Sequence, residues 1–109
     1  MEMTLDEYQV AALRTWSAHS RPESALTNAA LGLGEAGEVQ NLIKKHVYHG
    51  HTLDIAGVKK ELGDVLYYVA VLAEEIGFDL SEIAQANIVK LETRYPDGFD
   101  PERSKNRED

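Results

Sequence analysis

Residues 58–72 read Val58-Lys-Lys-Glu-Leu-Gly-Asp-Val-Leu-Tyr-Tyr-Val-Ala-Val-Leu72. Apolar residues recur along this stretch every three or four positions, which is the spacing of one face of an α-helix. The stripe consists of Val58, Leu62, Val65, Leu66, Val69, Leu72 and Ile76. Asp54 is placed to cap its start and Gly77 to stop its end. We therefore predict a helix over residues 55–76.

The same spacing predicts three further helices on either side of this one. The four helices are expected over residues 5–18, 24–48, 55–76 and 81–94. Thr4 and Glu7 have the pattern of a capping box at the start of the first helix, and Pro96 stops the last. We expect an all-α fold in one domain over residues 1–100. A charged tail over 101–109 is expected to be mobile or to lie on a partner subunit.

Length, charge and composition exclude several classes of protein. A chain of 109 residues and 12.1 kDa has room for one hydrophobic core. Its net charge of −8 repels phosphate backbones, so we expect no nucleic-acid polymer as a partner. The absence of cysteine excludes disulfide scaffolds and thiolate nucleophiles. The apolar runs are too short to span a bilayer and the N-terminus lacks a signal-peptide pattern, which predicts a cytoplasmic protein without membrane contact.

The size of the chain favours self-association. A monomer of this length buries only about 65% of the surface of its unfolded chain. Hydrophobic residues make up 43% of the sequence and supply material for a larger, shared core. We therefore expect a homodimer or a homotetramer, and the sequence does not decide between them.

Two acidic motifs stand on the two central predicted helices, Glu35-Ala36-Gly37-Glu38 and Glu61-Leu62-Gly63-Asp64. In each motif the acids are three residues apart and therefore share one helix face. The connection between these helices is short, so we expect them to lie antiparallel with the acidic pairs facing each other. Four carboxylates around one volume repel one another unless protons or a cation neutralise them. An all-oxygen set of ligands suits Mg²⁺.

The alternative is that these residues are ordinary solvated acids, in which the chain is rich. Two observations favour a site. Glu61 lies only about 60° from the centre of the apolar stripe of its helix, close to the core. Gly37 and Gly63 directly precede the second acid of each motif, although glycine costs about 1 kcal/mol in a helix. Their presence predicts close approach of helices or access for a ligand.

Glu-x-x-Glu followed after 22 residues by Glu-x-x-Asp resembles the signature of the MazG-like nucleoside triphosphate pyrophosphohydrolases, an all-α family. The resemblance runs from about residue 8 to residue 99 and includes residues 33–39, 61–66 and 87–96. It implies an oligomeric four-helix bundle with sites near the interface. Many members double the first acid, whereas here Gly34 precedes Glu35. This departure leaves the identity of the general base open.

The resemblance also implies an activity. Members cleave a nucleoside triphosphate, with ribose or deoxyribose, between the α and β phosphates to release a nucleoside monophosphate and pyrophosphate, which suits the disposal of surplus nucleotides. Carried over to this chain, it implies that Mg²⁺, with Mn²⁺ as a substitute, is bound by Glu35, Glu38, Glu61 and Asp64. Glu35 or Glu38 is then expected to orient the attacking water. Base, sugar and physiological substrate are not readable from the sequence.

Side chains that contact the substrate are expected on three helices. The candidates are Lys44, Lys45, Asn87, Lys90, Arg94, Tyr95 and Trp16. The cations among them suit phosphate groups, and the strip from Asn87 to Tyr95 resembles the late substrate-side motif of the family. The adjacent lysines equally suit a helix C-terminus without any ligand. The tryptophan is a candidate for stacking on a nucleobase or, alternatively, a core residue.

Two rival interpretations stay open. One is a non-catalytic helical dimerisation or nucleotide-binding module on the same scaffold. The presence of all four acids argues against it. The other is a transition-metal site at His46, His49 and His51. Its alternative is a helix end that favours cationic histidine.

Overall fold

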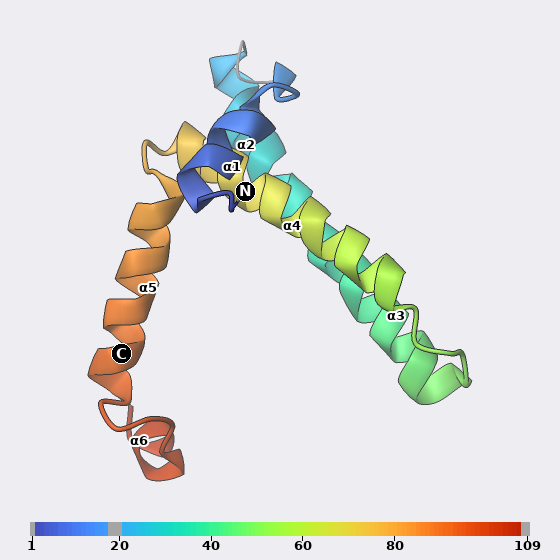
Figure 1. Ribbon diagram of the computed structural model, residues 1–109, viewed down its shortest axis with the longest axis vertical. Helices are drawn as coiled ribbons and strands as arrows, with labels where there is room; N and C mark the ends of the chain where they lie inside the picture. Colours follow the sequence, from blue (N-terminus) through green and yellow to red (C-terminus); the bar gives the residue numbers. More distant parts are fainter. Residues whose placement is uncertain (1, 18–20, 108–109) are drawn as a thin grey trace.

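The computed structural model describes residues 2–17 and 21–107, and the regular structure in these residues is helical (Figure 1). The chain passes in order through α1 (Leu5–Leu13), α2 (Pro22–Gly32), the 3-10 turn η2 (Leu33–Glu35), α3 (Ala36–His49), α4 (Ile55–Glu75), α5 (Leu80–Arg94) and α6 (Pro101–Lys105). Among the described residues, the only pairing of extended backbone is an isolated bridge between Pro96 and Gly98. The prediction of an all-α fold is confirmed. None of the helices in the described part of the chain combines the length and apolar character needed to cross a membrane.

The predicted helices over 55–76 and 81–94 agree closely with α4 and α5, because their caps are local. The Asp54 side chain accepts a hydrogen bond of 2.8 Å from the backbone N–H of Gly57 at the start of α4. A capping box of Asp79 and Glu82 begins α5. The predicted box of Thr4 and Glu7 likewise begins α1.

Two predicted boundaries are wrong. The first helix was expected over 5–18, but α1 ends at Leu13; residue 18 lies outside the described residues. The second was expected as one helix over 24–48, but η2 divides it into α2 and α3. Gly32 ends α2 directly against the ring of Tyr68 on α4, where an added Cβ would overlap the ring. This contact allows both α2 and α3 to pack on α4.

Helix α4 is the centre of the fold, because α1, α2, η2, α3 and α5 all contact it. The buried apolar residues are mostly small. They are Ala12, Ala25, Ala29, Ala70, Val71, Ala73 and Leu80. Partly buried side chains of Tyr8, Tyr67, Val69 and Ile83 pack against this core. Small side chains let the helices approach closely, but they bury little apolar surface.

A buried glutamine joins three helices at this core. Gln9 of α1 is 3% exposed. Its Nε2 donates to the carbonyl oxygens of Phe78 at 3.0 Å and Ala70 at 3.4 Å, and its Oε1 accepts from the backbone N–H of Leu80 at 2.8 Å. These bonds satisfy polar backbone groups at the turn between α4 and α5 and fix the direction in which α5 leaves the core.

The molecule has two arms that diverge from the junction of α1, α2 and the C-terminal end of α4 (Figure 1). One arm is the antiparallel pair of α3 and α4, and the other is α5 followed by α6. The segment expected to be a mobile tail contains α6, whose N-cap is Asp100. Arg103 connects it to the end of α5, because its Nε donates to the Arg94 carbonyl oxygen at 2.7 Å. Mobility of residues 101–109 or contact with a partner stays a prediction.

Candidate active site

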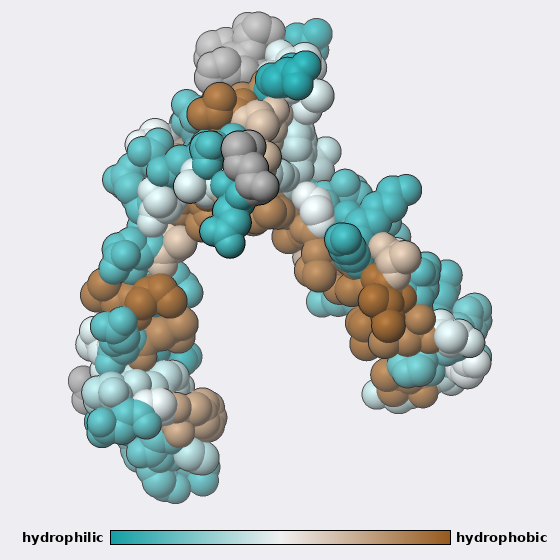
Figure 2. Space-filling model, viewed as in Figure 1, coloured by the Kyte–Doolittle hydropathy of each residue, from teal (hydrophilic) through white to brown (hydrophobic). Residues whose placement is uncertain are grey.

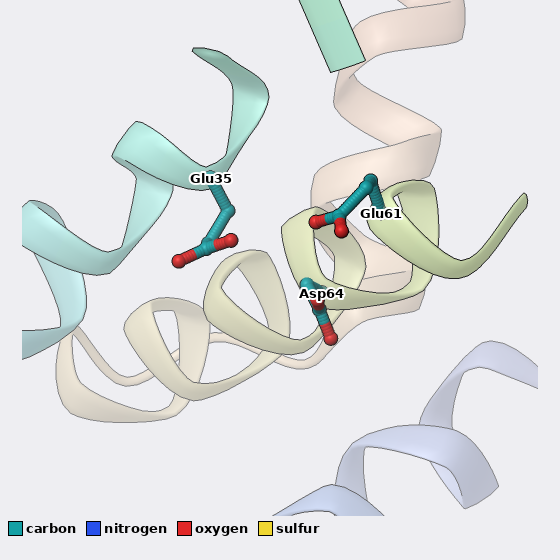
Figure 3. Close-up of side chains that lie close together, drawn as sticks. All are labelled: Glu35, Glu61 and Asp64. Atoms are coloured by element: carbon teal, nitrogen blue, oxygen red, sulfur yellow. The ribbon is translucent and has the colours of Figure 1, made fainter. Parts of the chain in front are cut away.

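Three of the four predicted acidic residues meet between η2 and α4. Glu35 is the last residue of η2, and Glu61 and Asp64 lie one turn apart on α4. Each offers a carboxylate oxygen, and these oxygens all lie within 4.8 Å of one another. Figure 3 shows the three side chains close together, with one carboxylate oxygen of Glu35 on the side of Glu61. The antiparallel arrangement predicted from the short connection therefore does bring acids from both motifs together.

Glu38 lies outside this group of three. It is exposed in the first turn of α3, whereas Glu35 and Glu61 are half-buried and Asp64 is exposed. The turn of η2 separates the two acids of the first motif, because Glu35 ends the 3-10 turn and Glu38 belongs to the regular α-helix that follows. A role for Glu38 as a metal ligand stays a prediction.

The electrostatics of the group are those of crowded acids. Partial removal from water raises the pKa of Glu61 above its ordinary value. The negative charges of Asp64, Glu35 and Glu38 raise this pKa further, and so does a hydrogen bond with Asp64. Glu38 is therefore close enough to act on the site by its charge. A cation between the carboxylates would offset the part of this shift that comes from their repulsion.

An open depression of about 350 Å³ lies along one face of α3. Gly37, Gln40, Asn41 and Lys44 line it. These positions recur at helical spacing, so one face of α3 carries two amides and an ammonium group next to the acidic motif. Lys44 belongs to this face, whereas Lys45 shares the face of Glu38, seven positions before it. Lys45 is half-buried and remains consistent with a role at the helix end.

Gly37 and Gly63 have no atom of the described residues within 4 Å of an added Cβ. Close approach of helices within one chain, one of the two predicted reasons for these glycines, is therefore wrong. The other reason, access to the site for a ligand, agrees with the open space beside them.

The late strip of predicted substrate residues lies on the other arm. Asn87, Lys90 and Arg94 are on α5, and Tyr95 caps its end and stacks on Phe99 at a centroid distance of 5.2 Å. Helix α5 diverges from the pair of α3 and α4 (Figure 1). Within a single chain, the fold therefore does not bring this strip beside the acidic group.

The remaining two predictions concern Trp16 and the histidines. Trp16 is half-buried, lies edge-on to Tyr67 and Tyr68, and donates from Nε1 to Glu75 Oε1 at 2.9 Å. These contacts favour packing, and stacking on a base stays a prediction.

His46 Nδ1 lies 2.9 Å from the backbone oxygen of His51. In the described residues, groups of side chains able to hold a metal include no histidine.

Three residues that the sequence did not single out line the depression or lie close to the acids. Gln40 and Asn41 line the depression, and their spacing from Gly37 and Lys44 on one helix was the available signal. Tyr8 of α1 was not among the predicted site residues. Burial, Tyr67 and the charge of Asp64 raise its pKa, so its hydroxyl lies within electrostatic reach of the acids.

Comparison with known proteins identifies the family. The MazG nucleotide pyrophosphohydrolase domain model matches residues 23–99, which contain both acidic motifs and the late strip. The chain is also 34% identical over 105 residues to the gene 37 protein of Mycobacterium phage L5, a match that covers 88% of this chain and 92% of the phage protein. No solved structure matches the chain. With the family model covering most of the chain and both acidic motifs in place on an all-α fold, the chain belongs to the MazG nucleotide pyrophosphohydrolase family.

Proposed function

We propose that this protein hydrolyses a nucleoside triphosphate between the α and β phosphates, with Mg²⁺ or Mn²⁺ as the cofactor. One observation carries the proposal. Carboxylates from two separate elements converge within 4.8 Å in a chain of the MazG family. A cluster of this kind has a physical cost unless a cation offsets it, as the raised pKa of Glu61 indicates.

The residues present fit a hard divalent cation. Glu35, Glu61 and Asp64 offer oxygen atoms alone, and no nitrogen or sulfur ligand that would favour zinc belongs to the group. The openness of the site beside Gly37 and Gly63 leaves room for phosphate oxygens. Bound there, the cation would neutralise phosphate charge and make the phosphorus atom a better electrophile.

The side chains of the chain itself have distinct tasks in this proposal. Glu38 is exposed beside the cluster, and its free carboxylate is placed to accept the proton of the attacking water, with Glu35 as the alternative. Lys44 supplies positive charge for a phosphate in a protein of net charge −8. Gln40 and Asn41 line the same depression as Lys44, and their amides can donate hydrogen bonds to a substrate that extends into it.

The first experiment is a panel of ribo- and deoxyribonucleoside triphosphates, common and modified, with Mg²⁺ or Mn²⁺. Pyrophosphate and orthophosphate are measured separately. The expected result is pyrophosphate together with the matching monophosphate. Orthophosphate with a diphosphate would show cleavage at the β–γ bond and contradict the proposal. If the folded protein hydrolyses none of these nucleotides, the result would favour a nucleotide-binding module instead.

Variants of the cluster test the assignment of residues. Glu61→Gln and Asp64→Asn each remove one charge at nearly constant size. Either change is expected to lower kcat/KM by at least about 100-fold, since a metal ligand contributes several kcal/mol to transition-state stabilisation. Glu74→Gln is the matched control, because Glu74 is a half-buried acid of the same helix outside the cluster. If Asp64→Asn keeps the wild-type kcat/KM, the assignment of the α4 acids to the site is wrong.

A further inference from the structure

One face of α1 lies against α4 in the turns that follow its acidic motif. Ala12 of α1 is buried with Ala70 of α4 in the core, and Gln9 bonds to the carbonyl oxygen of Ala70. Tyr8 is one turn before Ala12 on α1 and packs against the same core. The ring of Tyr8 is therefore held in place where α1 meets α4.

Tyr67 connects this junction to the acids of α4. It lies three positions after Asp64, so the two side chains are on one face of α4, about one turn apart. The Tyr67 hydroxyl accepts a hydrogen bond of 3.0 Å from Oγ1 of Thr15, just beyond the end of α1. Because that bond uses only a lone pair of the Tyr67 oxygen, the Tyr67 hydroxyl can still donate its own proton to another acceptor.

The hydroxyl of Tyr8 is a donor without a partner. Within the part of the chain that the structure describes, no hydrogen bond involves it. No side-chain polar atom of these residues is both closed off from solvent and unpaired, so the hydroxyl of half-buried Tyr8 is open to solvent. Burial, Tyr67 and the charge of Asp64 raise the pKa of Tyr8, which agrees with a hydroxyl close to both side chains.

Asp64 is the exposed member of the acidic group, whereas Glu35 and Glu61 are half-buried. An exposed side chain has several rotamers open to it, and binding a cation requires it to keep one of them. Each acid offers one oxygen to the group, and Figure 3 shows an oxygen of Asp64 that points away from Glu61. This outward oxygen is the acceptor for a donor that fixes the side chain, as metal-binding carboxylates generally have.

We propose that Tyr8 is a positioning residue of the metal site, whose hydroxyl donates a hydrogen bond to the outward oxygen of Asp64 and thereby directs the other oxygen to the cation. The inference rests on the proposed function, because it takes the cation and its ligands from that proposal. A role in packing alone does not account for the hydroxyl, since phenylalanine would bury the same ring without a polar group to desolvate.

The inference gives α1 a task at the site beyond its packing on α4. Thr15, Tyr67 and Tyr8 form a row of hydroxyls between the end of α1 and Asp64, and a hydroxyl that accepts a hydrogen bond becomes a better donor to the next group. The family model begins its match at residue 23, so α1 lies before the matched part of the chain.

Binding of Mn²⁺ to the full chain tests the inference without reference to activity. Electron paramagnetic resonance of the free ion measures the Kd. Tyr8→Phe removes only the hydroxyl and is expected to raise this Kd about 10-fold, with unchanged helical circular dichroism. Tyr48→Phe is the matched control, because it makes the same change at a tyrosine of α3 that is 79% exposed. An unchanged Kd in Tyr8→Phe would overturn the inference alone, whereas a wild type that binds no Mn²⁺ would overturn the proposed metal site with it.

A double-mutant cycle identifies the group through which Tyr8 acts. If the hydroxyl works through Asp64, Tyr8→Phe is expected to leave the Mn²⁺ Kd nearly unchanged in an Asp64→Ala background, because the acceptor is already gone. In a Glu35→Gln background, the rise of about 10-fold is expected to persist. A rise of that size in the Asp64→Ala background would show that the hydroxyl serves another group and would contradict the inference.

Turnover separates positioning from direct contact with the substrate. In Tyr8→Phe, the Mg²⁺ concentration that gives half-maximal rate is expected to rise about 10-fold, while kcat at saturating Mg²⁺ stays at the wild-type level. A lower kcat that excess Mg²⁺ does not restore would place the hydroxyl on the substrate and overturn the positioning role. Mn²⁺ binding that depends on Tyr8, in a wild type that hydrolyses no nucleotide, would support the inference and contradict the proposed reaction.

Discussion

At the scale of single residues, Gln9 shows how one buried amide holds three helices. The backbone N–H of Leu80 donates to its Oε1, and no hydrophobic side chain can supply that acceptor. We expect Gln9→Leu to lower the free energy of unfolding by about 1–3 kcal/mol, the cost of leaving a buried polar group unpaired. Chemical denaturation measures this, with Val10→Ala as a control, since Val10 is 69% exposed. Equal stability of Gln9→Leu and wild type would show that the bonds add nothing net.

Gly32 is a second residue whose role depends on a distant contact. A methyl group there would overlap the ring of Tyr68. We expect Gly32→Ala to destabilise the protein by about 1–3 kcal/mol through overpacking, although alanine is the better helix former. Gly34→Ala is the matched control, because nothing lies within 4 Å of its added carbon. The thermal unfolding midpoints of Gly32→Ala and Gly34→Ala measure the effect. A higher midpoint for Gly32→Ala than for wild type would mean that the Tyr68 ring moves aside at little cost.

At the scale of helices, local signals predicted what local bonds determine. The stripe and caps of α4 and α5 lie within each segment, so their bounds could be read from the sequence. The break at η2 was not predicted, and beside it Gly32 packs against Tyr68, a residue 36 positions away that no local pattern relates to it. The same break explains why Glu35 joins the acids of α4 and Glu38 does not.

The angle between α1 and α5 is held by a pair of bonds that depend on pH. Both carboxylate oxygens of Asp6 accept hydrogen bonds from Ser81, one from the hydroxyl at 2.7 Å and one from the backbone N–H at 2.9 Å. The bond from the hydroxyl, followed by that from the backbone, lowers the pKa of Asp6 below its ordinary value of 3.8. Because the pKa is lower in the folded state than in the unfolded state, the stabilisation is fully present above the unfolded pKa. It is lost as the pH falls through the folded pKa.

The difference in unfolding free energy between wild type and Asp6→Ala is therefore expected to be present at neutral pH and to shrink below about pH 4. Denaturation at a series of pH values measures it. Glu2→Ala, which removes another exposed acid from the same terminal segment, is the control for the loss of one negative charge. A difference that stays constant into acid would assign the effect to packing instead.

At the scale of the whole molecule, the sequence predicted that apolar surface would remain exposed in one chain, but not where. Composition predicted that a chain of this size would share a core. The sequence could not show which surfaces remain open, because the apolar stripe of α5 (Ala84, Ile88, Leu91 and Tyr95) is indistinguishable from one that packs within its own chain. Only the divergence of the two arms reveals it (Figure 1), and Figure 2 shows apolar surface along both arms.

If a second copy completes the core, stability must depend on concentration. Unfolding of a dimer releases two chains, so the folded state gains by mass action as the protein concentration rises. We expect the thermal midpoint to increase by several degrees across a hundredfold range of concentration, since about 2.7 kcal/mol accompanies a hundredfold change in a linked species. Ile88→Asp is expected to abolish this dependence, because Ile88 is an exposed residue of the α5 stripe, and Val89→Asp to keep it, because Val89 is similarly exposed on another face of the helix. A midpoint independent of concentration in the wild type would mean that the open chain is stable alone and that its small, alanine-rich core suffices.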